Sequence, residues 1–459
     1  MVARNYEFKP IVFYRDNPIK ILSLYDRPHV AAFSVSVWNE QLSLAVARLV
    51  KGKFPECLIV FGGPSVPFDA TEYLDIFPFI DVVVKGAGEL PFADILERFT
   101  ESRDFSCIGA ISFRDWANGK IINNALERTD LIQIEDIDVF RSPYLDGVFS
   151  PLLGKDLRWQ AILETNRGCP FLCTYCFWGR GGISRKIKFF SLERIKQEID
   201  WCGKHRVLYV FCADGNFGMF NRDLEISNYL AQTKQSMGYP ERFRVNYAKN
   251  TDEKVIKVAS VLHSSKLEKA ITMSLQSFNK DALNNVKRKN IKMATFHELQ
   301  RKFKDEDLST YTELILGLPG ETYQTWVDGL ETCLKNGINN DIFVYLLQIY
   351  PNTELSRKEY QERFKVASVR MPLNEGHGAI RSPDIPVEFE QGVVGTYSMP
   401  LVEWKKAVVV SWLMQAFVGL KFGYFIVLYL TDRFGLRYMD IIEFLAHKKG
   451  SMPKNTVLI

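Results

Sequence analysis

Short apolar runs alternate with helical patterns over the first 125 residues, and this alternation predicts a parallel α/β sheet. Apolar residues recur at helical spacing between Leu42 and Leu49, so a helix is expected to cover one face of that sheet. The expected strands are runs rich in β-branched and aromatic residues: Ile11–Tyr14, Val30–Val37, Leu58–Phe61, Val82–Val84 and Ile108–Phe113.

A second α/β region is expected over residues 160–358. Its first helix should begin after Ser191, a residue type that caps helices, because Leu192, Ile195, Ile199 and Cys202 follow at helical spacing. Six strand-and-helix units in series predict a partial (β/α)6 barrel. Its strands are expected at Ala161–Glu164, Leu208–Phe211, Arg242–Asn246, Ala270–Leu275, Thr312–Leu316 and Ile342–Leu347.

The remaining segments carry weaker patterns. Residues 126–159 are expected to form a linker, and residues 359–459 a mainly helical C-terminal region. Residues 407–430 are long enough to span a bilayer, and Lys421 is their only charge. Gly419, Lys421 and Gly423 interrupt this run, so two buried helices are favoured over a membrane span. Contact with a lipid or a membrane-bound substrate stays open.

Composition narrows the class of protein. The chain has 459 residues, of which 47% are apolar and 24% charged, which is typical of a globular protein. The formal net charge is +4 without any basic run, so no nucleic-acid partner is expected. Three of the eight cysteines are clustered and the others scattered, which favours a reducing compartment over a disulfide scaffold. The N-terminus shows no apolar leader, and a cytoplasmic location is expected.

The strongest chemical signal is a group of three cysteines, Cys169, Cys173 and Cys176, directly after the first expected barrel strand. Three thiolates on one short loop can bind three irons of a [4Fe–4S] cluster and leave the fourth iron without a protein ligand. A structural zinc site is the alternative, but zinc requires a fourth protein ligand. The nearest candidates, Cys202 and His205, lie a helix away, so the cluster is favoured.

The cysteine loop, with aromatic Tyr175 before its last cysteine, resembles the cluster motif of the radical S-adenosylmethionine (SAM) enzymes. The resemblance implies that SAM chelates the fourth iron and that reduction of the cluster cleaves SAM to a 5′-deoxyadenosyl radical. Asp214 and Asn216 depart from the family's usual glycine-glycine-glutamate, and a turn-forming role is the alternative for Asp214. The SAM contacts that the resemblance implies are Tyr175, Asp214, Asn216, Gln276, Ser277, Gly317 and Pro319.

Three N-terminal segments, each at the end of an expected strand, resemble the cobalamin-binding domain that precedes such barrels in one large subfamily. His29 does not match the histidine motif of cobalamin proteins, so cobalt is expected to lack a histidine ligand. The region begins at what resembles the second strand, so its first βα unit is expected to be missing. Trp38 could equally be a core or interface residue. The implied cobalamin contacts are Ser36, Trp38, Asn39, Gly62, Gly63, Gly86, Gly88 and Glu89.

The resemblance implies a cobalamin-dependent methyltransferase that acts on an unactivated carbon of a small-molecule or biosynthetic substrate. An electron donor such as a flavodoxin or a ferredoxin is the implied partner. Two alternatives stay open: the same cofactors could drive rearrangement, cyclisation or oxidation, or the N-terminal domain could lack cobalamin. A methylthiotransferase is disfavoured, because that group carries three further N-terminal cysteines and only Cys57 and Cys107 are available. The sequence assigns no catalytic acid or base.

Overall fold

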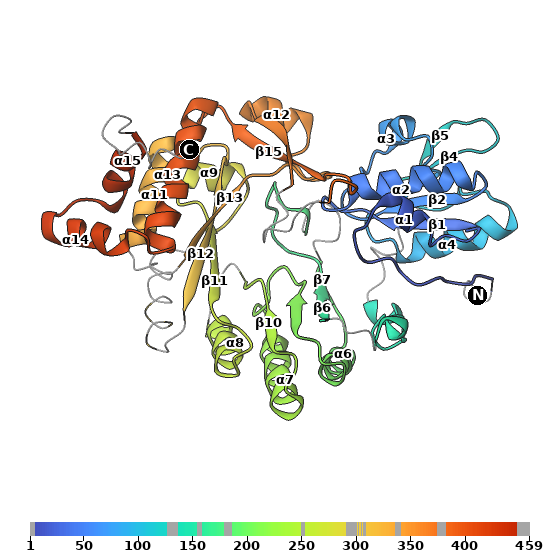
Figure 1. Ribbon diagram of the computed structural model, residues 1–459, viewed down its shortest axis with the longest axis horizontal. Helices are drawn as coiled ribbons and strands as arrows, with labels where there is room; N and C mark the ends of the chain where they lie inside the picture. The colour runs from blue at the N-terminus through green and yellow to red at the C-terminus, as the bar shows by residue number, and fades with distance from the viewer. Residues whose placement is uncertain are drawn as a thin grey trace.

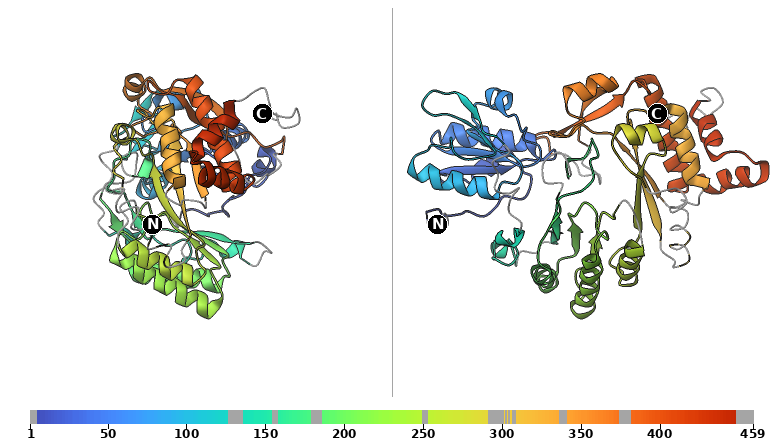
Figure 2. Two further views of the ribbon diagram at one scale, coloured as in Figure 1. Left: turned by 90° about the vertical axis from the view of Figure 1, so that its left-hand side faces the viewer. Right: turned by 180° about the vertical axis from the view of Figure 1, so that it is seen from behind.

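The computed structural model describes residues 5–125, 136–153, 158–178, 186–248, 253–290, 301, 303, 305, 309–335, 341–373 and 382–447. An N-terminal sheet, a central series of strands and helices, and a group of C-terminal helices follow one another along the longest axis (Figure 1). A two-stranded ribbon, β14 (Ala367–Pro372) with β15 (Phe389–Gly395), extends from the C-terminal helices toward the N-terminal sheet (Figures 1 and 2).

The N-terminal sheet has five strands in the order β1–β2–β3–β4–β5. The first three are parallel, and β4 and β5 are antiparallel additions at one edge. The carboxyl ends of β1, β2 and β3 therefore share one edge of the sheet. The elements are α1 (Pro18–Leu22), β1 (Val30–Ser34), α2 (Glu40–Lys53), β2 (Leu58–Gly62), α3 (Thr71–Ile76), β3 (Val82–Val84), α4 (Glu89–Glu101), β4 (Ile111–Arg114) and β5 (Ile121–Asn123).

Helices cover both faces of this sheet, which explains why its strands are apolar at nearly every position. Ile59 and Phe61 of β2 belong to a core cluster with apolar residues of α2 and α3. Leu58 and Val60 belong to a second cluster with residues of α4. The helix expected between Leu42 and Leu49 is confirmed as α2.

Two expectations for this region were wrong. Residues 11–14 form no strand, and Phe13 instead packs on Trp159 with ring centroids 5.9 Å apart, so this apolar run serves as a contact between segments. The sheet is not wholly parallel, because β4 pairs antiparallel with β3, and the chain then turns back at residues 115–119 and adds the short strand β5, which the sequence pattern did not indicate.

The second region contains two parallel three-stranded sheets, β6–β9–β10 and β11–β12–β13. The expected strands are all present, with ends shifted by at most two residues. Phe243 N donates to Leu267 O at 3.0 Å and so links β10 to the chain before β11. The bounds are β6 (Gln160–Leu163), α6 (Leu192–Lys204), β9 (Tyr209–Cys212), α7 (Asn221–Met237), β10 (Arg242–Arg244), α8 (Glu253–Ser264), β11 (Ile271–Gln276), α9 (Lys280–Asn285), β12 (Thr310–Leu316), α11 (Tyr323–Lys335) and β13 (Asp341–Leu346).

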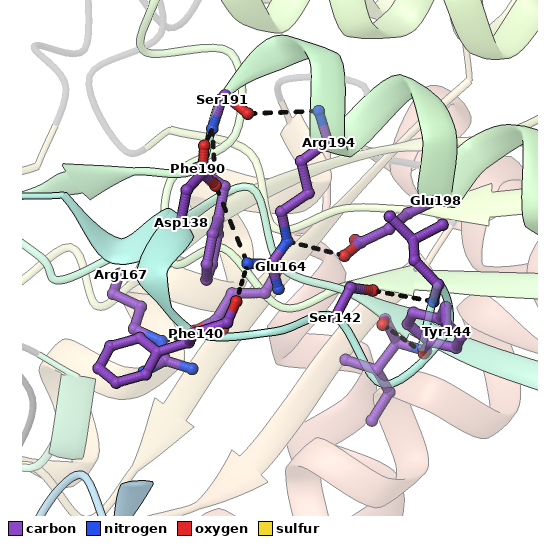
Figure 3. Close-up of polar contacts among 12 residues, drawn as sticks. Asp138, Phe140, Ser142, Tyr144, Glu164, Arg167, Phe190, Ser191, Arg194 and Glu198 are labelled. Carbon is purple, nitrogen blue, oxygen red and sulfur yellow. Dashed lines mark hydrogen bonds and ion pairs between the residues drawn. The ribbon is translucent and has the colours of Figure 1, made fainter. Parts of the chain in front are cut away.

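Residues 136–153 of the expected linker are docked on the first strand-and-helix unit (Figure 3). The Asp138 carboxylate accepts from Ser191 N at 3.0 Å, just before α6 begins. Arg194 of α6 donates to the Phe140 carbonyl oxygen. Tyr144 hydrogen-bonds both the N–H and the carbonyl of Ile162 in β6, at 3.0 and 2.7 Å. Short 3-10 turns lie at Ile137–Val139 and Ser150–Leu152.

The C-terminal region is less helical than expected. After α12 (Lys358–Phe364), β14 (Ala367–Pro372) and β15 (Phe389–Gly395) form an antiparallel ribbon. No sequence pattern predicted β14, because its side chains are partly or fully exposed and no apolar alternation marks it.

Helices follow from Leu401 as expected: α13 (Leu401–Met414), a π-helical turn (Gln415–Gly419), α14 (Tyr424–Phe434) and α15 (Tyr438–His447). The expectation of two buried helices is confirmed for α13 and wrong for α14, which buries only Val427. Among the described residues no single helix is long and apolar enough to cross a bilayer. Leu401–Gly419 and Tyr424–Phe434 would reach that length only together, and they are bent by 94°.

Gly63 provides a first test of the N-terminal loops. Its φ is +108°, and an added Cβ would lie 2.5 Å from the Val35 carbonyl oxygen. Gly119 also has a positive φ, +73°, but faces open space. Gly119→Ala should therefore lower the unfolding free energy by about 1–2 kcal/mol, and Gly63→Ala by a further 1–3 kcal/mol, roughly. Urea denaturation measures both, and equal losses would contradict this packing.

Glu268 provides a second test, through the pH dependence of stability. Tyr247 donates a hydrogen bond to it, and burial raises the pKa of the Glu268 carboxyl from 4.5 to about 8. The folded protein then holds a proton that the unfolded chain releases, so this residue's contribution to stability falls as pH rises through that window. Glu268→Gln should make the unfolding free energy less dependent on pH between 5 and 8, approximately. Exposed Glu253→Gln is the control, and an unchanged pH profile in Glu268→Gln would contradict the account.

Candidate functional site

The three-cysteine loop begins where β6 ends and is held at its base. Asn166–Arg167 pairs with Lys188–Phe189 as a short antiparallel ribbon, β7 with β8. Gly168 follows with φ +110°, a conformation that favours glycine and turns the chain into the loop. Cys169 and Cys173 are buried and Cys176 is half-buried, and none of the three forms a disulfide with another described residue.

The donor chemistry of this loop suits an iron–sulfur cluster, since soft thiolates are its usual ligands. In the part of the chain that the structure describes, no three Cys, His, Asp or Glu side chains are drawn together as a metal site. Coordination bonds themselves supply the free energy that gathers such ligands and orders their loop. Among the described residues, the two candidates for the fourth ligand that zinc would need are engaged elsewhere: Cys202 lies in the core, and His205 Nδ1 contacts the Trp201 carbonyl oxygen at 2.8 Å.

Asp214 anchors the start of the loop from the end of β9. This fully buried carboxylate accepts from Thr165 N at 2.8 Å, Asn166 N at 3.2 Å and Asn166 Nδ2 at 2.7 Å, and from the Thr165 hydroxyl. Burial raises its pKa to about 6, and the hydrogen bonds to Thr165 and Asn166 oppose that rise. Because both oxygens are engaged by protein donors, the structure favours a positioning role for Asp214, in place of the simple turn-forming alternative.

Asn216, two residues further on, faces the cysteines directly. Its Nδ2 donates to Cys169 Sγ at 3.2 Å, and only 5% of the residue is exposed. Its Oδ1 is buried and has no hydrogen-bond partner among the described residues. An unsatisfied buried acceptor is costly and therefore marks a place where a ligand donor would fit. Asn216 is thus an expected SAM contact from outside the cysteine loop whose side chain hydrogen-bonds one of the cysteines.

The end of β11 carries the next two expected SAM contacts. Gln276 has φ +67° beside an irregularity in strand pairing, which is an unusual conformation for a side chain other than glycine. The Ser277 hydroxyl donates to Glu321, and it accepts from Asn279 N at 2.9 Å. Ser277 is thus committed to internal contacts, whereas the backbone geometry at Gln276 is the more distinctive feature.

Two residues that the sequence reasoning missed fix this strand end. Arg288 is 4% exposed, donates to the Ser274 carbonyl oxygen, and lies 3.5 Å from the Tyr175 hydroxyl. Asn290 Nδ2 donates to the carbonyls of Leu275 at 2.6 Å and Ser277 at 2.9 Å. Both lie in a basic segment typical of an exposed surface, so no pattern in the sequence indicated these contacts. They connect the expected SAM loop to Tyr175 of the cysteine loop.

The loop after β12 completes this edge. Gly317 has φ +101° and lies against Leu347 and Val393, where an added Cβ would be 3.6 Å from each. The Pro319 carbonyl oxygen accepts from Asn285 Nδ2 at 3.1 Å. These contacts fix the backbone of the loop against the chain after β13 and against β15.

The expected cobalamin residues all lie at the carboxyl edge of the N-terminal sheet. Asn39 closes the first loop, since its side chain accepts from Ser36 N at 2.7 Å and donates to Ser34 O at 2.8 Å. Trp38 is 59% exposed, which excludes the core alternative. The second loop contains Gly62 and Gly63. The third contains Gly86, with φ +66°, and Gly88, and ends at Glu89, where α4 begins.

Asp214→Asn tests the anchor. The amide of this variant replaces one acceptor oxygen with an NH2 group, which faces the four donors of Thr165 and Asn166. At least one of those donors is left unpaired, which lowers the unfolding free energy by about 1–3 kcal/mol. We expect anaerobically purified Asp214→Asn to retain less iron than the wild type and to melt at a lower temperature. Asp200→Asn removes a carboxylate that accepts from Tyr229 on the outer helices and serves as the control. Equal iron content in the wild type and both variants would contradict an anchoring role.

The amino-acid sequence of this chain is similar to those of known proteins. Residues 163–347 match the family model described as the radical SAM superfamily. The chain is 33% identical over 458 residues to 2-(S-pantetheinyl)-carbapenam-3-carboxylate methyltransferase of Streptantibioticus cattleyicolor, covering 100% of this chain and 66% of that protein. It is also 33% identical over 447 residues to the cobalamin-dependent radical SAM methyltransferase TokK of Streptomyces tokunonensis, covering 96% and 64%. The chain thus spans slightly less than two thirds of each relative.

Solved structures share the fold. The radical SAM methyltransferase TsrM of Kitasatospora setae, with tryptophan and a SAM analogue bound, superposes with a TM-score of 0.58 at 15% identity, over 79% of this chain and 70% of that one. The cobalamin-dependent SAM radical enzyme OxsB gives 0.59 at 15% identity, over 94% and 65%. Residues 163–347 thus match the radical SAM superfamily, nearly the whole chain is similar to two methyltransferases, and TsrM and OxsB share its fold.

Proposed function

We propose that Cys169, Cys173 and Cys176 hold a [4Fe–4S] cluster and that SAM binds at the iron these residues leave free. The observation that carries the proposal is the contact between Asn216 and Cys169, with the unpartnered Oδ1 of Asn216 beside the thiols. The SAM ammonium group is a hydrogen-bond donor of the kind this oxygen lacks. Gln276 and the backbone of Gly317 and Pro319 would border the rest of SAM, with Tyr175, Asp214 and Ser277 positioning these segments.

We further propose that the two three-stranded sheets are the halves of a partial (β/α)6 barrel over residues 160–358. The carboxyl ends of β6, β9, β11 and β12 lead into the cysteine loop, Asp214–Asn216, Gln276–Ser277 and the Gly317 loop, where ligand sites of parallel barrels lie. The proposed division continues with a cobalamin domain over residues 1–125, a linker over 126–159 and a C-terminal region over 359–459.

Cobalamin is proposed to bind the carboxyl edge of the N-terminal sheet, where ligands of open α/β sheets bind. The close approach of Gly63 to the Val35 backbone packs the first two loops together at this edge. The exposed Trp38 ring would cover one corrin face. Support for cobalamin comes from TokK, whose name states its dependence on this cofactor.

The proposed reaction is methylation of an unactivated carbon in a small biosynthetic intermediate, with electrons from a flavodoxin or a ferredoxin in the cytoplasm. When bound, the cofactors supply reductive cleavage of SAM, hydrogen abstraction and a methyl group carried on cobalt. The chain contributes placement: Asn216 orients SAM at the cluster, Asp214 fixes the cysteine loop, and the N-terminal loops face the barrel. A relative named as a methyltransferase of a carbapenam supports a small-molecule substrate.

A second outcome, cyclisation or oxidation with the same cofactors, has some support. An anaerobic magnesium-protoporphyrin IX monomethyl ester cyclase of Cereibacter sphaeroides is 26% identical over 318 residues, covering 64% of this chain. The two relatives matched along nearly the whole chain are more similar and are methyltransferases, so methyl transfer is favoured.

Cysteine variants test the cluster. Cys169→Ala, Cys173→Ala and Cys176→Ala should each lose most of the roughly four irons and four sulfides that the anaerobically reconstituted wild type binds per chain. Cys202→Ala removes a buried thiol of α6 and serves as the control. This variant should keep the irons and sulfides. Stoichiometric zinc without sulfide in the wild type would overturn the proposal.

A further inference from the structure

The three loops proposed to bind cobalamin are each held by one residue from the other part of the chain. Arg167 lies at the start of the cysteine loop. Asn352 lies in the segment after β13, and Glu388 directly precedes β15. No sequence pattern marked any of them. The ribbon's approach to the N-terminal sheet is visible in two views (Figures 1 and 2).

Glu388 makes the most buried of these contacts, since its side chain is 0% exposed. Its Oε2 accepts from Gln41 N at 2.7 Å and its Oε1 from Leu42 N at 3.0 Å. These N–H groups belong to the first turn of α2, where an anion is favoured by the helix dipole and by unpaired donors. Arg15 lies 3.6 Å from the same carboxylate and donates to the Pro386 carbonyl at 3.1 Å. Glu388 therefore caps the helix that follows Trp38 and Asn39.

Asn352 holds the second loop with both ends of its amide. Its Oδ1 accepts from Phe68 N at 2.8 Å, and its Nδ2 donates to the Val66 carbonyl oxygen at 2.9 Å. Its φ of +64° is one that asparagine tolerates better than most residues. The paired contacts fix the chain just after Gly62 and Gly63.

Arg167 holds the third loop. Its Nη1 lies 2.6 Å from Glu89 Oε1, and its Nε lies 3.0 Å from Glu164 Oε2. The guanidinium also lies over the rings of Phe140 and Phe190, at 5.4 and 5.6 Å (Figure 3). Glu89 begins α4 directly after Gly88. The ion pair therefore connects the third loop to Arg167, the residue that precedes Gly168 and Cys169.

The same three residues are closely connected to the proposed SAM and cluster site. Arg167 is two positions before Cys169. Leu355, three positions after Asn352, donates its N–H to the Thr174 carbonyl oxygen of the cysteine loop at 2.9 Å. The β14–β15 ribbon, next to Glu388, is hydrogen-bonded to the end of β13, because Val393 N donates to Leu347 O at 2.8 Å. Each loop of the N-terminal sheet is thus connected to the cysteine loop or to a barrel strand through one side chain.

We propose that Arg167, Asn352 and Glu388 are positioning residues that fix the distance between bound cobalamin and the iron–sulfur cluster. The inference rests on the proposed function. Transfer between two bound groups depends steeply on their separation, and a misplacement of about 1 Å can reduce a rate by about a hundredfold. Three contacts on three separate loops constrain both the separation and the relative orientation of the two sites.

The test measures magnetic coupling between cob(II)alamin and the reduced cluster by electron paramagnetic resonance, because spin coupling reports their separation without any substrate. The wild type should show one well-defined coupling. Glu388→Ala and the double variant Arg167→Met/Asn352→Ala should bind cobalamin and iron but show a weaker, broader coupling. Glu388→Gln keeps one acceptor oxygen and should restore much of the wild-type signal. Glu390→Ala removes a contact between β15 and Gln348, which does not involve the N-terminal sheet. This variant should show the same coupling as the wild type.

Hydrogen exchange of the Gln41 and Leu42 amides provides an independent readout. It should become about tenfold faster in Glu388→Ala, as expected for the loss of a helix cap. Unchanged coupling in all variants, with cobalamin bound, would overturn the positioning role while leaving the proposed function intact. Absence of cobalamin from the reconstituted wild type would overturn both, and faster exchange would then show only that Glu388 caps α2.

Discussion

The geometry of the site depends on a buried carboxylate, Asp214, that accepts hydrogen bonds from both residues at the start of the cysteine loop. A buried polar group is stable only when it is satisfied, and here four donors from Thr165 and Asn166 satisfy it. This links the end of β9 to the end of β6 and fixes the direction in which the chain leaves the strand. Asn216 is thereby held two residues away, with its amide on Cys169.

The rest of the site consists of strand ends whose backbones are constrained in similar ways. Arg288 and Asn290 hold the end of β11, and the positive φ of Gln276 and Gly317 gives both neighbouring segments unusual local geometry. Glycine adopts a positive φ readily, but at Gln276 this conformation is strained and persists only where surrounding contacts over-determine the backbone. The chain therefore presents a set of pre-placed loop backbones at one edge, with the cysteine thiols and Asn216 among them.

The sequence predicted the parts of this arrangement that are local. Strand periodicity located β6 and β9 to β13, Ser191 marked the start of α6, and the spacing of three cysteines indicated iron–sulfur chemistry. Contacts between distant segments left no such signal. Glu388 contacts a loop 347 positions earlier in the chain and Asn352 one 284 positions earlier, and Arg288 is buried although its neighbours are basic. The exposed strand β14 and the exposed aromatic residues of α14 were missed because sequence patterns report apolar periodicity, and burial depends on tertiary partners.

The central claim is that one chain brings cobalamin and SAM together for methyl transfer, and it can be tested without knowing the substrate. Reduced protein reconstituted with cob(I)alamin is mixed anaerobically with SAM carrying a labelled methyl group, and the cobalamin is then analysed by mass. The account predicts labelled methylcobalamin together with an equal amount of S-adenosylhomocysteine. Bound cobalamin that stays unmethylated, under conditions in which SAM is bound, would contradict it.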